Sequence, residues 1–407
     1  MTSVLQLVSP VQGISCHAWN PSGDCVAICP NNNEIHLYKK STTGLKNWEC
    51  TDILKEHDLI VSSIDWSINN HIVTCSHDRN AFVWTLDDNT KKWKPTLVIL
   101  QIDRGALHVR WSACGKKFAV ASGSKKVPIC SYDSNRDWWI SKSITKKFKS
   151  TVLCCAFHPK NSQLIATGSC DFRCRIYSTY SSDVDGQNID SGPFKSAQIF
   201  GETYYEMTTA GWVNAVAWSP LGDYLAFASH DSTIHIASFD GNNYLDLNTE
   251  PSIQRVLHKS LPFTTLIFGT FGNIDNDDIN LIAAGHDFQP YLIRKQSSAK
   301  NSWYIVDSID KESQKSSSSD SGSSSVAAAR ALFKAKSERG QDSAVTRKDQ
   351  IQTKHASCVS EMRLITGNTD NNGGASLSSS AFDGRLVLWN VESSIQTLNT
   401  SMTQMAI

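Results

Sequence analysis

The chain has 407 residues, of which 40% are hydrophobic, and its formal net charge at pH 7 is zero. A neutral chain has no bulk attraction for nucleic acid or for an anionic membrane surface, so we expect neither as a partner. The longest apolar runs, such as Leu97–Leu100, are far too short to cross a bilayer, so we expect no membrane insertion.

The first predicted element is a strand at residues 4–8, Val4–Val8. It precedes the first of several repeated units, described next. Ring-shaped repeat folds commonly close by lending one terminal strand to the last unit, which leaves no free sheet edge. We therefore assign residues 4–8 as the outer strand of the seventh unit.

A pattern of apolar residues then recurs seven times. An apolar residue is followed five positions later by a large one, and six of the seven later residues are aromatic, although aromatic residues make up only 9% of the chain. The pairs are Ile14/Trp19, Val61/Trp66, Ala106/Trp111, Val152/Phe157, Val213/Trp218, Phe263/Phe268 and Val359/Leu364. Self-similarity at a period of roughly 45–50 residues indicates a repeat architecture.

Each unit holds a second landmark, in which a turn residue precedes the end of a predicted strand by six positions. The pairs are Asn32/Tyr38, Asp78/Trp84, Lys126/Tyr132, Asp171/Tyr177, Asp231/Ala237, Asp287/Ile293 and Asp383/Trp389. Short strands that alternate with turns at this period are typical of four-stranded propeller blades. The sequence therefore predicts an all-β fold. A single seven-bladed β-propeller should span residues 1–407, with blades beginning near residues 14, 61, 106, 152, 213, 263 and 359.

The turn aspartates have a predicted structural role. A carboxylate in a tight turn can accept hydrogen bonds from backbone amides and from a neighbouring Ser or His, which ties one blade together. In the second unit the candidates are His57, Ser76, Asp78 and Trp84. The corresponding residues of later units are Asp171, Asp231, Asp287, Asp383 and Trp389.

Four lysines lie close together ahead of the fourth unit: Lys142, Lys146, Lys147 and Lys149. A basic patch on a neutral protein would suit an acidic partner, because opposite charge speeds encounter and fixes orientation. Ordinary solvated loops are the alternative interpretation.

A long insertion, residues 297–353, separates the sixth and seventh units. Its serine-rich stretch, residues 315–325, cannot bury enough surface to order itself, so we expect a flexible tether. Residues 326–336 follow and contain strong helix formers, which predicts a short helix. Its candidate partner-binding residues are Val326, Ala329, Arg330, Leu332, Phe333, Lys334 and Lys336. The helix either binds a groove on another protein or folds back onto a blade.

No catalytic, metal or cofactor motif is found. The twelve cysteines contain no CxxC pair, and free thiols in a reducing compartment are the better interpretation than zinc ligands. Ser76–Asp78 and Ser229–Asp231 spell the letters of a hydrolase triad, but adjacent turn residues cannot converge in the triad geometry. We expect no enzyme activity, no cofactor and no metal.

Several stretches resemble one family. The sequences Ile14–Asn20, Ser76–Asn80, Lys94–Leu100, Gly168–Ile176 and Ser229–Thr233 are similar to the WD-repeat subunit 1 of the actin-related protein 2/3 complex. So is the insertion with its short Leu–Phe helix. The resemblance covers essentially the whole chain. The serine tract and the stretch Asn368–Gly374 look longer than the family norm, which puts the tether length in doubt but not the number of blades.

The resemblance implies a non-catalytic subunit of a seven-subunit complex that starts actin filament branches in the cytoplasm, at the actin cytoskeleton. It implies contacts with actin-related protein 2, with complex subunits 4 and 5, with the actin filament, and with nucleation-promoting factors of the WASP type. Leu332 and Phe333 would be the anchors of the inserted helix. The alternatives are a generic WD-repeat scaffold or a ubiquitin-ligase substrate receptor. Many such receptors carry Arg two places after a strand-ending Trp-Asp, whereas Trp84 and Trp389 lack it.

Overall fold

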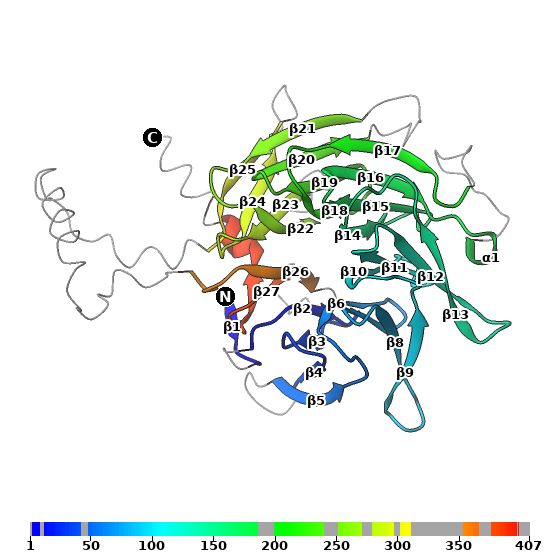
Figure 1. Ribbon diagram of the computed structural model, residues 1–407. Coiled ribbons are helices and arrows are strands. Elements are labelled where there is room, and N and C mark those ends of the chain that lie inside the picture. Colours follow the sequence, from blue (N-terminus) through cyan, green and yellow to red (C-terminus); the bar gives the residue numbers. More distant parts are fainter. Residues whose placement is uncertain are drawn as a thin grey trace, which may run out of the picture.

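The computed structural model is a ring of four-stranded antiparallel sheets around a central channel (Figure 1). It describes residues 2–8, 12–41, 48–185, 199–239, 251–270, 279–296, 302–310, 353–365, 376–396 and 398. Seven such sheets are present in these ranges, so the prediction of an all-β, seven-bladed propeller is confirmed.

Each blade is numbered by its innermost strand in chain order. Blade 1 comprises β2 (Cys16–Trp19), β3 (Cys25–Cys29), β4 (Ile35–Lys40) and β5 (Trp48–Leu54). Blade 2 comprises β6 (Val61–Trp66), β7 (Ile72–Ser76), β8 (Asn80–Leu86) and β9 (Trp93–Ile99). Blade 3 comprises β10 (Ala106–Trp111), β11 (Lys117–Ser122), β12 (Val127–Asp133) and β13 (Trp138–Ile144). Blade 4 comprises β14 (Val152–Phe157), β15 (Leu164–Ser169), β16 (Arg173–Ser178) and β17 (Thr203–Thr208), with helix α1 (Ser182–Asp185) between the last two.

The remaining blades follow the same order. Blade 5 comprises β18 (Val213–Trp218), β19 (Tyr224–Ser229), β20 (Thr233–Ser238) and β21 (Ser252–Leu257). Blade 6 comprises β22 (Phe263–Thr270), β23 (Ile279–Gly285), β24 (Tyr291–Lys295) and β25 (Trp303–Ser308). Blade 7 comprises β26 (Val359–Ile365), β27 (Ser376–Ala381), β28 (Leu386–Asn390) and the N-terminal strand β1 (Ser3–Leu5). Residues 391–396 are helical, and Val391 and Ile395 pack in the core beside Trp389.

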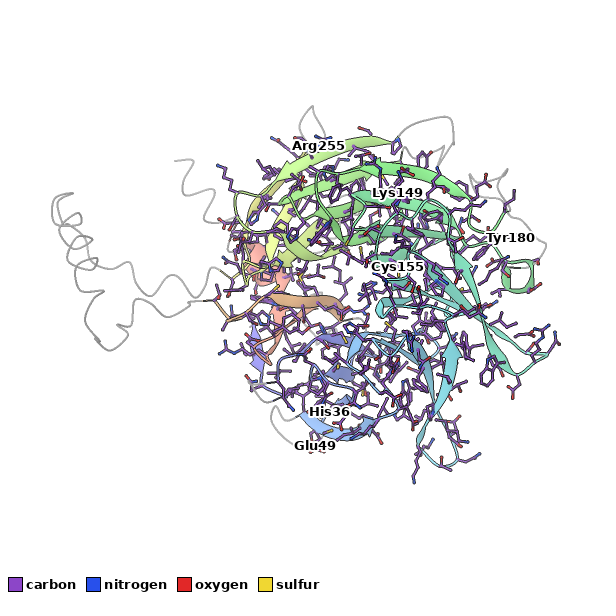
Figure 2. The ribbon with its side chains drawn as sticks, viewed as in Figure 1. His36, Glu49, Lys149, Cys155, Tyr180 and Arg255 are labelled. Atoms are coloured by element: carbon purple, nitrogen blue, oxygen red, sulfur yellow. The ribbon has the colours of Figure 1, made fainter. Side chains whose placement is uncertain are left out.

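The inner strands line the channel and the fourth strands form the rim. Figure 2 shows this order, with Cys155 of β14 near the centre of the ring and Glu49 and Arg255 on the outer strands β5 and β21. The core lies between neighbouring blades. At the junction of blades 2 and 3, for example, Trp111 of the repeated pattern packs edge-on against Phe118 and Trp139. Large apolar residues at the end of each inner strand therefore fill the wedge between two sheets.

A ring of side-chain hydrogen bonds joins the inner strands. The residue after the first apolar landmark donates to the backbone carbonyl of the landmark in the next blade. The bonds run from Ser15 to Val61 (3.2 Å), Ser62 to Ala106 (2.8 Å), Asn214 to Phe263 (3.2 Å), Thr264 to Val359 (2.7 Å) and Ser360 to Ile14 (2.8 Å). Cys154 contributes the equivalent contact from blade 4 to Val213. Blades 3 and 4 have Leu107 and Leu153 at this position, neither of which can donate, and Cys154 is the residue that follows Leu153.

The N-terminal strand closes the ring on the outer side of blade 7, but it is shorter than residues 4–8. Ser3, Val4 and Leu5 pair with Leu388, Val387 and Leu386. Leu5 pairs with Leu386, which is the first residue of β28, so the residues after Leu5 have no strand partner. The predicted extension of this strand to Val8 is therefore wrong. The Gln6 amide instead donates to the carbonyl of Gly384 (2.9 Å).

The predicted start of the insertion at residue 297 also needs correction. Residues 303–308 form β25, the outer strand of blade 6, in which Trp303 is buried against Tyr224 and Phe268. The sequence interpretation missed this strand because only its first and last side chains are buried, so its apolar pattern is weak. Residues 311–352 lie outside the described residues, and the predicted helix 326–336 falls among them.

Candidate functional site

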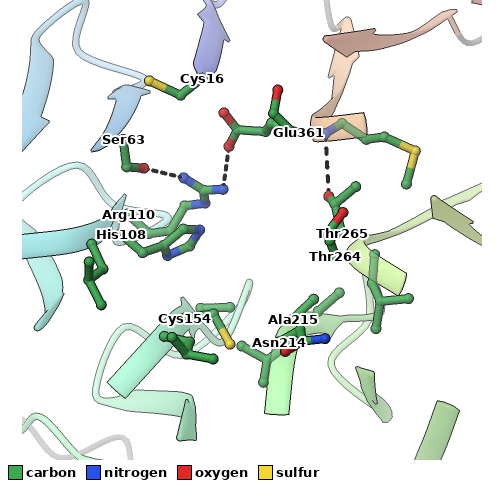
Figure 3. Close-up of a pocket in the computed structure, with 18 of the residues that line it drawn as sticks. Cys16, Ser63, His108, Arg110, Cys154, Asn214, Ala215, Thr264, Thr265 and Glu361 are labelled. Carbon is green, nitrogen blue, oxygen red and sulfur yellow. Dashed lines mark hydrogen bonds and ion pairs between the residues drawn. The ribbon is translucent and has the colours of Figure 1, made fainter. Parts of the chain in front are cut away.

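The central channel holds a cluster of buried polar and charged side chains. A cavity of about 340 Å³ lies there, lined by inner strands of all seven blades (Figure 3). The charged side chains of its wall are Arg110 of blade 3 and Glu361 and Arg363 of blade 7. Opposite them, blades 4 to 6 present mostly apolar and uncharged side chains, among them Cys154, Asn214 and Ala215. The channel is therefore charged on one side only.

Two arginines and two carboxylates form a network across the charged side. Glu361 lies 2.6 Å from Arg110 and 3.0 Å from Arg363, measured from Oε1 to the guanidinium nitrogens. Arg363 also lies 2.8 Å from Asp65, whose other oxygen accepts from the backbone N–H of Trp111 (2.7 Å). Because Glu361 and Arg363 belong to β26, Asp65 to β6 and Arg110 to β10, this channel network connects blades 7, 2 and 3.

Blade 1 joins the same network through His17 on β2. Its backbone N–H donates to Glu361 (3.0 Å), and its ring nitrogens contact Ser380 and Ser378 of blade 7 (2.9 and 2.8 Å). Burial lowers the pKa of His17 to about 3, so the imidazole is neutral at pH 7. Burial alone would raise the pKa of Glu361, but Arg363, Arg110 and the His17 N–H lower it below its ordinary value. The seam between the first and last blades thus depends on buried polar contacts.

A Cys–His pair beside the channel does not form an activated nucleophile. The Cys155 sulfur lies 3.7 Å from Nδ1 of His108, and the Cys155 backbone N–H donates to the same nitrogen (3.3 Å). Burial raises the pKa of the Cys155 thiol to about 12 and lowers the pKa of His108 well below its ordinary value. Both groups are therefore neutral, and a thiolate–imidazolium pair does not form.

The predicted turn residues of blade 2 form a connected chain, with one member that sequence reasoning missed. His57 Nδ1 lies 2.7 Å from the Asp78 carboxylate, and its Nε2 lies 2.9 Å from the Thr74 hydroxyl. Trp84 Nε1 donates to the same hydroxyl (3.1 Å). Ser76 lies to the side, where it donates to the Leu59 carbonyl and accepts from the Asp78 N–H. The chain Trp84–Thr74–His57–Asp78 ties β7, β8, the turn between them and the loop before β6 together.

Blade 7 repeats this chain with serine in place of threonine. Ser379 accepts from Trp389 Nε1 (2.7 Å) and contacts His355 Nε2 (2.7 Å), while His355 Nδ1 lies 3.4 Å from Asp383. The sequence pattern predicted Asp383 and Trp389 as members of this chain, but neither Ser379 nor His355. The missed signal is a hydroxyl residue four positions before the turn aspartate, which is present in both blades.

The other predicted turn aspartates use different partners. In blade 4 both oxygens of Asp171 accept from the buried Arg175 guanidinium (3.1 and 2.9 Å). In blade 5 Asp231 accepts from the Thr233 N–H (3.1 Å). In blade 6 Asp287 accepts from the Ser260 hydroxyl (2.8 Å) and faces His258 (3.5 Å).

The four predicted patch lysines are all exposed, whereas Ile144 and Phe148 between them are buried. Lys142 places its ammonium 4.3 Å from the centre of the Phe200 ring. Lys147 lies 3.9 Å from Glu206. Glu206 also contacts Arg173 and Arg175, and the backbone N–H of Lys149 donates to the Asp171 carboxylate (3.0 Å).

The candidate residues of the inserted helix lie outside the described residues: Val326, Ala329, Arg330, Leu332, Phe333, Lys334 and Lys336. In the described ranges, no group of three or more His, Cys, Asp or Glu side chains could hold a metal ion. The helices in those ranges are too short or too polar to cross a membrane.

The channel network was missed entirely by sequence reasoning. A signal was present on β26, where Glu361 and Arg363 stand at alternating positions and therefore face the same side of the strand. In the sequence, each of these charged residues has the pattern of an ordinary solvent-exposed position on a strand. Only the closed ring places them together in the channel.

The closed ring of seven four-stranded blades, with His–Asp turn chains, defines a seven-bladed WD-repeat propeller. The family model "WD domain, G-beta repeat" matches residues 48–85, 142–178 and 201–237. These matches fall on blades 1–2, 3–4 and 4–5, where the outer strand of one unit joins the inner strands of the next.

Relatives that match nearly the whole chain identify its family within the WD-repeat propellers. The chain is 35% identical to "Actin-related protein 2/3 complex subunit 1A-A" of Xenopus laevis, over 95% of this chain and 97% of the relative. It is 35% identical to subunit 1A of Arabidopsis thaliana, over 95% and 96%. It is 31% identical to subunit 1 of Schizosaccharomyces pombe, over 92% and 95%. The chain belongs to the family of actin-related protein 2/3 complex subunit 1, as the sequence resemblance indicated.

Proposed function

We propose that this chain is the WD-repeat subunit of a seven-subunit actin-related protein 2/3 complex, and that it serves there as a non-catalytic scaffold for actin nucleation and branching. The observation that carries the proposal is 35% identity over 95% of the chain to relatives named for that complex. The paired charges of the channel support a structural role. We expect the protein in the cytoplasm, at the actin cytoskeleton.

The proposed neighbours within the complex are actin-related protein 2 and subunits 4 and 5. The rim and faces of the ring offer surface for such contacts, because several large apolar side chains are exposed. Trp138 on β13 is 43% exposed and Trp212 before β18 is 48% exposed, whereas Trp139 is buried. Large exposed aromatic residues are enriched at protein interfaces, which supports interface roles for Trp138 and Trp212.

Affinity purification tests membership of the complex. The tagged full-length chain is purified from its own cells, and its partners are identified by mass spectrometry. We expect actin-related protein 2 and subunits 4 and 5 in near-equal amounts with the tagged chain. Recovery of ubiquitin-ligase subunits instead would favour the substrate-receptor alternative. Recovery of neither set would favour a generic scaffold.

We further propose that the lysine patch (Lys142, Lys146, Lys147 and Lys149) receives the acidic tail of a WASP-type nucleation-promoting factor. Four exposed ammonium groups attract an acidic segment, and rim charges mainly speed association. Replacing all four with Ala should lower the association rate for an acidic peptide at least several-fold. A matched control replaces the exposed Lys91 and Lys92 of the β8–β9 turn. Equal losses in both variants would contradict the patch.

The inserted helix is proposed to bind actin through Leu332 and Phe333. The support is the sequence pattern and the family resemblance, since these residues lie outside the described ranges. Replacing both with Ala should reduce filament branch density while complex assembly persists. Branch density is counted by fluorescence microscopy with purified complex. Wild-type branching in the double variant would contradict this role.

A further inference from the structure

Two cysteines of blade 1 face each other across neighbouring strands. Cys16 on β2 and Cys29 on β3 are direct partners in the antiparallel register. Residues at such positions have Cα atoms about 4.5–5.5 Å apart, which lies within the range of roughly 4.4–6.8 Å that disulfides show. The Cys16 thiol also hydrogen-bonds to the Cys29 sulfur. On the described strands, no other cysteine has a cysteine as its register partner.

The Cys29 sulfur lies at the base of the turn at Asn31, which has a positive φ of 53°. The Cys29 thiol hydrogen-bonds to the backbone carbonyls of Asn32 (3.3 Å) and Val61 (3.6 Å). Hydrogen bonds from Ser15 and from the backbone at Asn31 and Asn32 favour the thiolate form of Cys29.

The acidity of the two thiols follows from these contacts. The hydrogen bond from Cys16, together with those from Ser15 and from the backbone at Asn31 and Asn32, lowers the pKa of Cys29 to about 7, although burial opposes this. Burial raises the pKa of Cys16, which therefore keeps the shared proton. Cys25, on the same strand as Cys29, faces Lys39, and burial raises its pKa to about 12. Cys25 is thus a natural control for reactivity.

We propose that Cys16 and Cys29 form a redox-active dithiol that a small peroxide converts to a disulfide within blade 1. Both side chains are buried, but Cys16 belongs to the wall of the channel cavity and the Asn31 turn is exposed, so a small neutral oxidant has a short path. Figure 3 shows the Cys16 side chain at the edge of this cavity, with its sulfur turned away from the cavity centre. The site is independent of the proposed function.

The reaction balances with hydrogen peroxide as the only co-reactant. The thiolate sulfur attacks one peroxide oxygen, the O–O bond breaks, and the leaving hydroxide takes up a proton to become water. The second sulfur then attacks the resulting sulfenic acid, forms the S–S bond and displaces a second water. Two thiols are oxidised and one peroxide is reduced to two waters.

Peptide mapping tests the site in the full-length chain. The reduced protein is treated with hydrogen peroxide, free thiols are alkylated, and the chain is cut with trypsin and an Asp-specific protease. Cleavage before Asp24 and after Lys39 separates Cys16, in residues 1–23, from Cys25 and Cys29, in residues 24–39. A disulfide joins the two peptides and removes two hydrogens. Fragment spectra identify which sulfur of the second peptide is linked.

We expect a Cys16–Cys29 link in the wild type that disappears on treatment with dithiothreitol. The link should persist in Cys25→Ser and fall at least tenfold in Cys16→Ser and Cys29→Ser. The wild-type map alone decides the matter if either serine variant fails to fold. A link from Cys16 to Cys25, the absence of any link, or separate over-oxidation of the two sulfurs would each overturn the proposal.

Discussion

Replacing Glu361 with Gln measures how much the channel network contributes to stability. The substitution keeps the side-chain shape and removes the charge, so Arg110 loses its carboxylate partner and Arg363 keeps only Asp65. Glu361 is only 6% exposed, so water replaces little of the lost interaction. Breaking a buried ion pair by removing one partner costs about 3–5 kcal/mol. We expect a loss in this range for Glu361→Gln.

The corresponding change in melting temperature follows from the length of the chain. Unfolding entropy of about 2.1 cal/mol/K per residue gives roughly 0.85 kcal/mol/K for the 407 residues. A loss of about 3–5 kcal/mol therefore lowers Tm by about 4–6 °C. The assay is thermal unfolding at pH 7, followed by circular dichroism and scanning calorimetry.

A surface glutamate provides the matched control. Glu34 pairs with Lys55 (2.8 Å), whose side chain is 64% exposed. Such surface pairs contribute about 0–1 kcal/mol, so Glu34→Gln should change Tm by roughly 1 °C at most. Adding Arg110→Met to Glu361→Gln should recover part of the loss, because one unpaired buried charge is removed. A Tm for Glu361→Gln that matches the Glu34→Gln value would refute the reasoning.

Three further predictions concern single residues. His17 has a pKa of about 3 in the folded protein and an ordinary pKa of 6.5. Between pH 3 and pH 6.5 the imidazole therefore binds a proton only in the unfolded chain. The free energy of unfolding should fall by about 1.4 kcal/mol for each pH unit below pH 6.5. In urea unfolding at pH 7, 6 and 5, the free energy of unfolding of His17→Gln should fall less steeply with decreasing pH than that of the wild type. An equally steep fall would contradict this prediction. Thr74→Val leaves the buried histidine and tryptophan partners of the hydroxyl unpaired, so urea unfolding should show a loss of about 1–3 kcal/mol. A loss within error of zero would exclude the turn chain as a stabilising element. Gly222→Ala would place a Cβ 2.0 Å from His158 at φ +83°, so its Tm should fall more than that of Gly201→Ala, which has φ +73° and would place a Cβ in ordinary contact with Ile144 at 3.8 Å. Equal Tm values would show that the contact relaxes freely.

The number and order of the blades could be predicted because the evidence is local and repeated. The landmark residues Val61 and Trp66 are the ends of β6, and Val213 and Trp218 are the ends of β18, so one short pattern marks a whole inner strand. β25 had no such pattern. Its central side chains are partly buried or exposed, so its sequence does not differ from that of an insertion, although Trp303 packs against Tyr224 in the fold.

The channel network and the turn chains could not be predicted in the same way. Glu361 and His17 are 344 positions apart, and only ring closure makes them hydrogen-bonded neighbours. In the blade 2 turn, Ser76 and Thr74 lie two positions apart and both are hydroxyl residues. The fold decides between them, because Thr74 faces His57 and Trp84 while Ser76 faces the Leu59 carbonyl.

The formal neutrality of the chain hides a separation of its charges. In the channel, two arginines are matched by two carboxylates, so this part of the interior contributes no net charge to the field outside the ring. The patch lysines are exposed, and the nearby Glu206 is shared with two arginines. Removing the lysines should therefore change partner association with little effect on stability, whereas removing Glu361 should do the reverse. Zero net charge excludes bulk attraction to polyanions, but it leaves room for a local basic surface that selects one acidic segment.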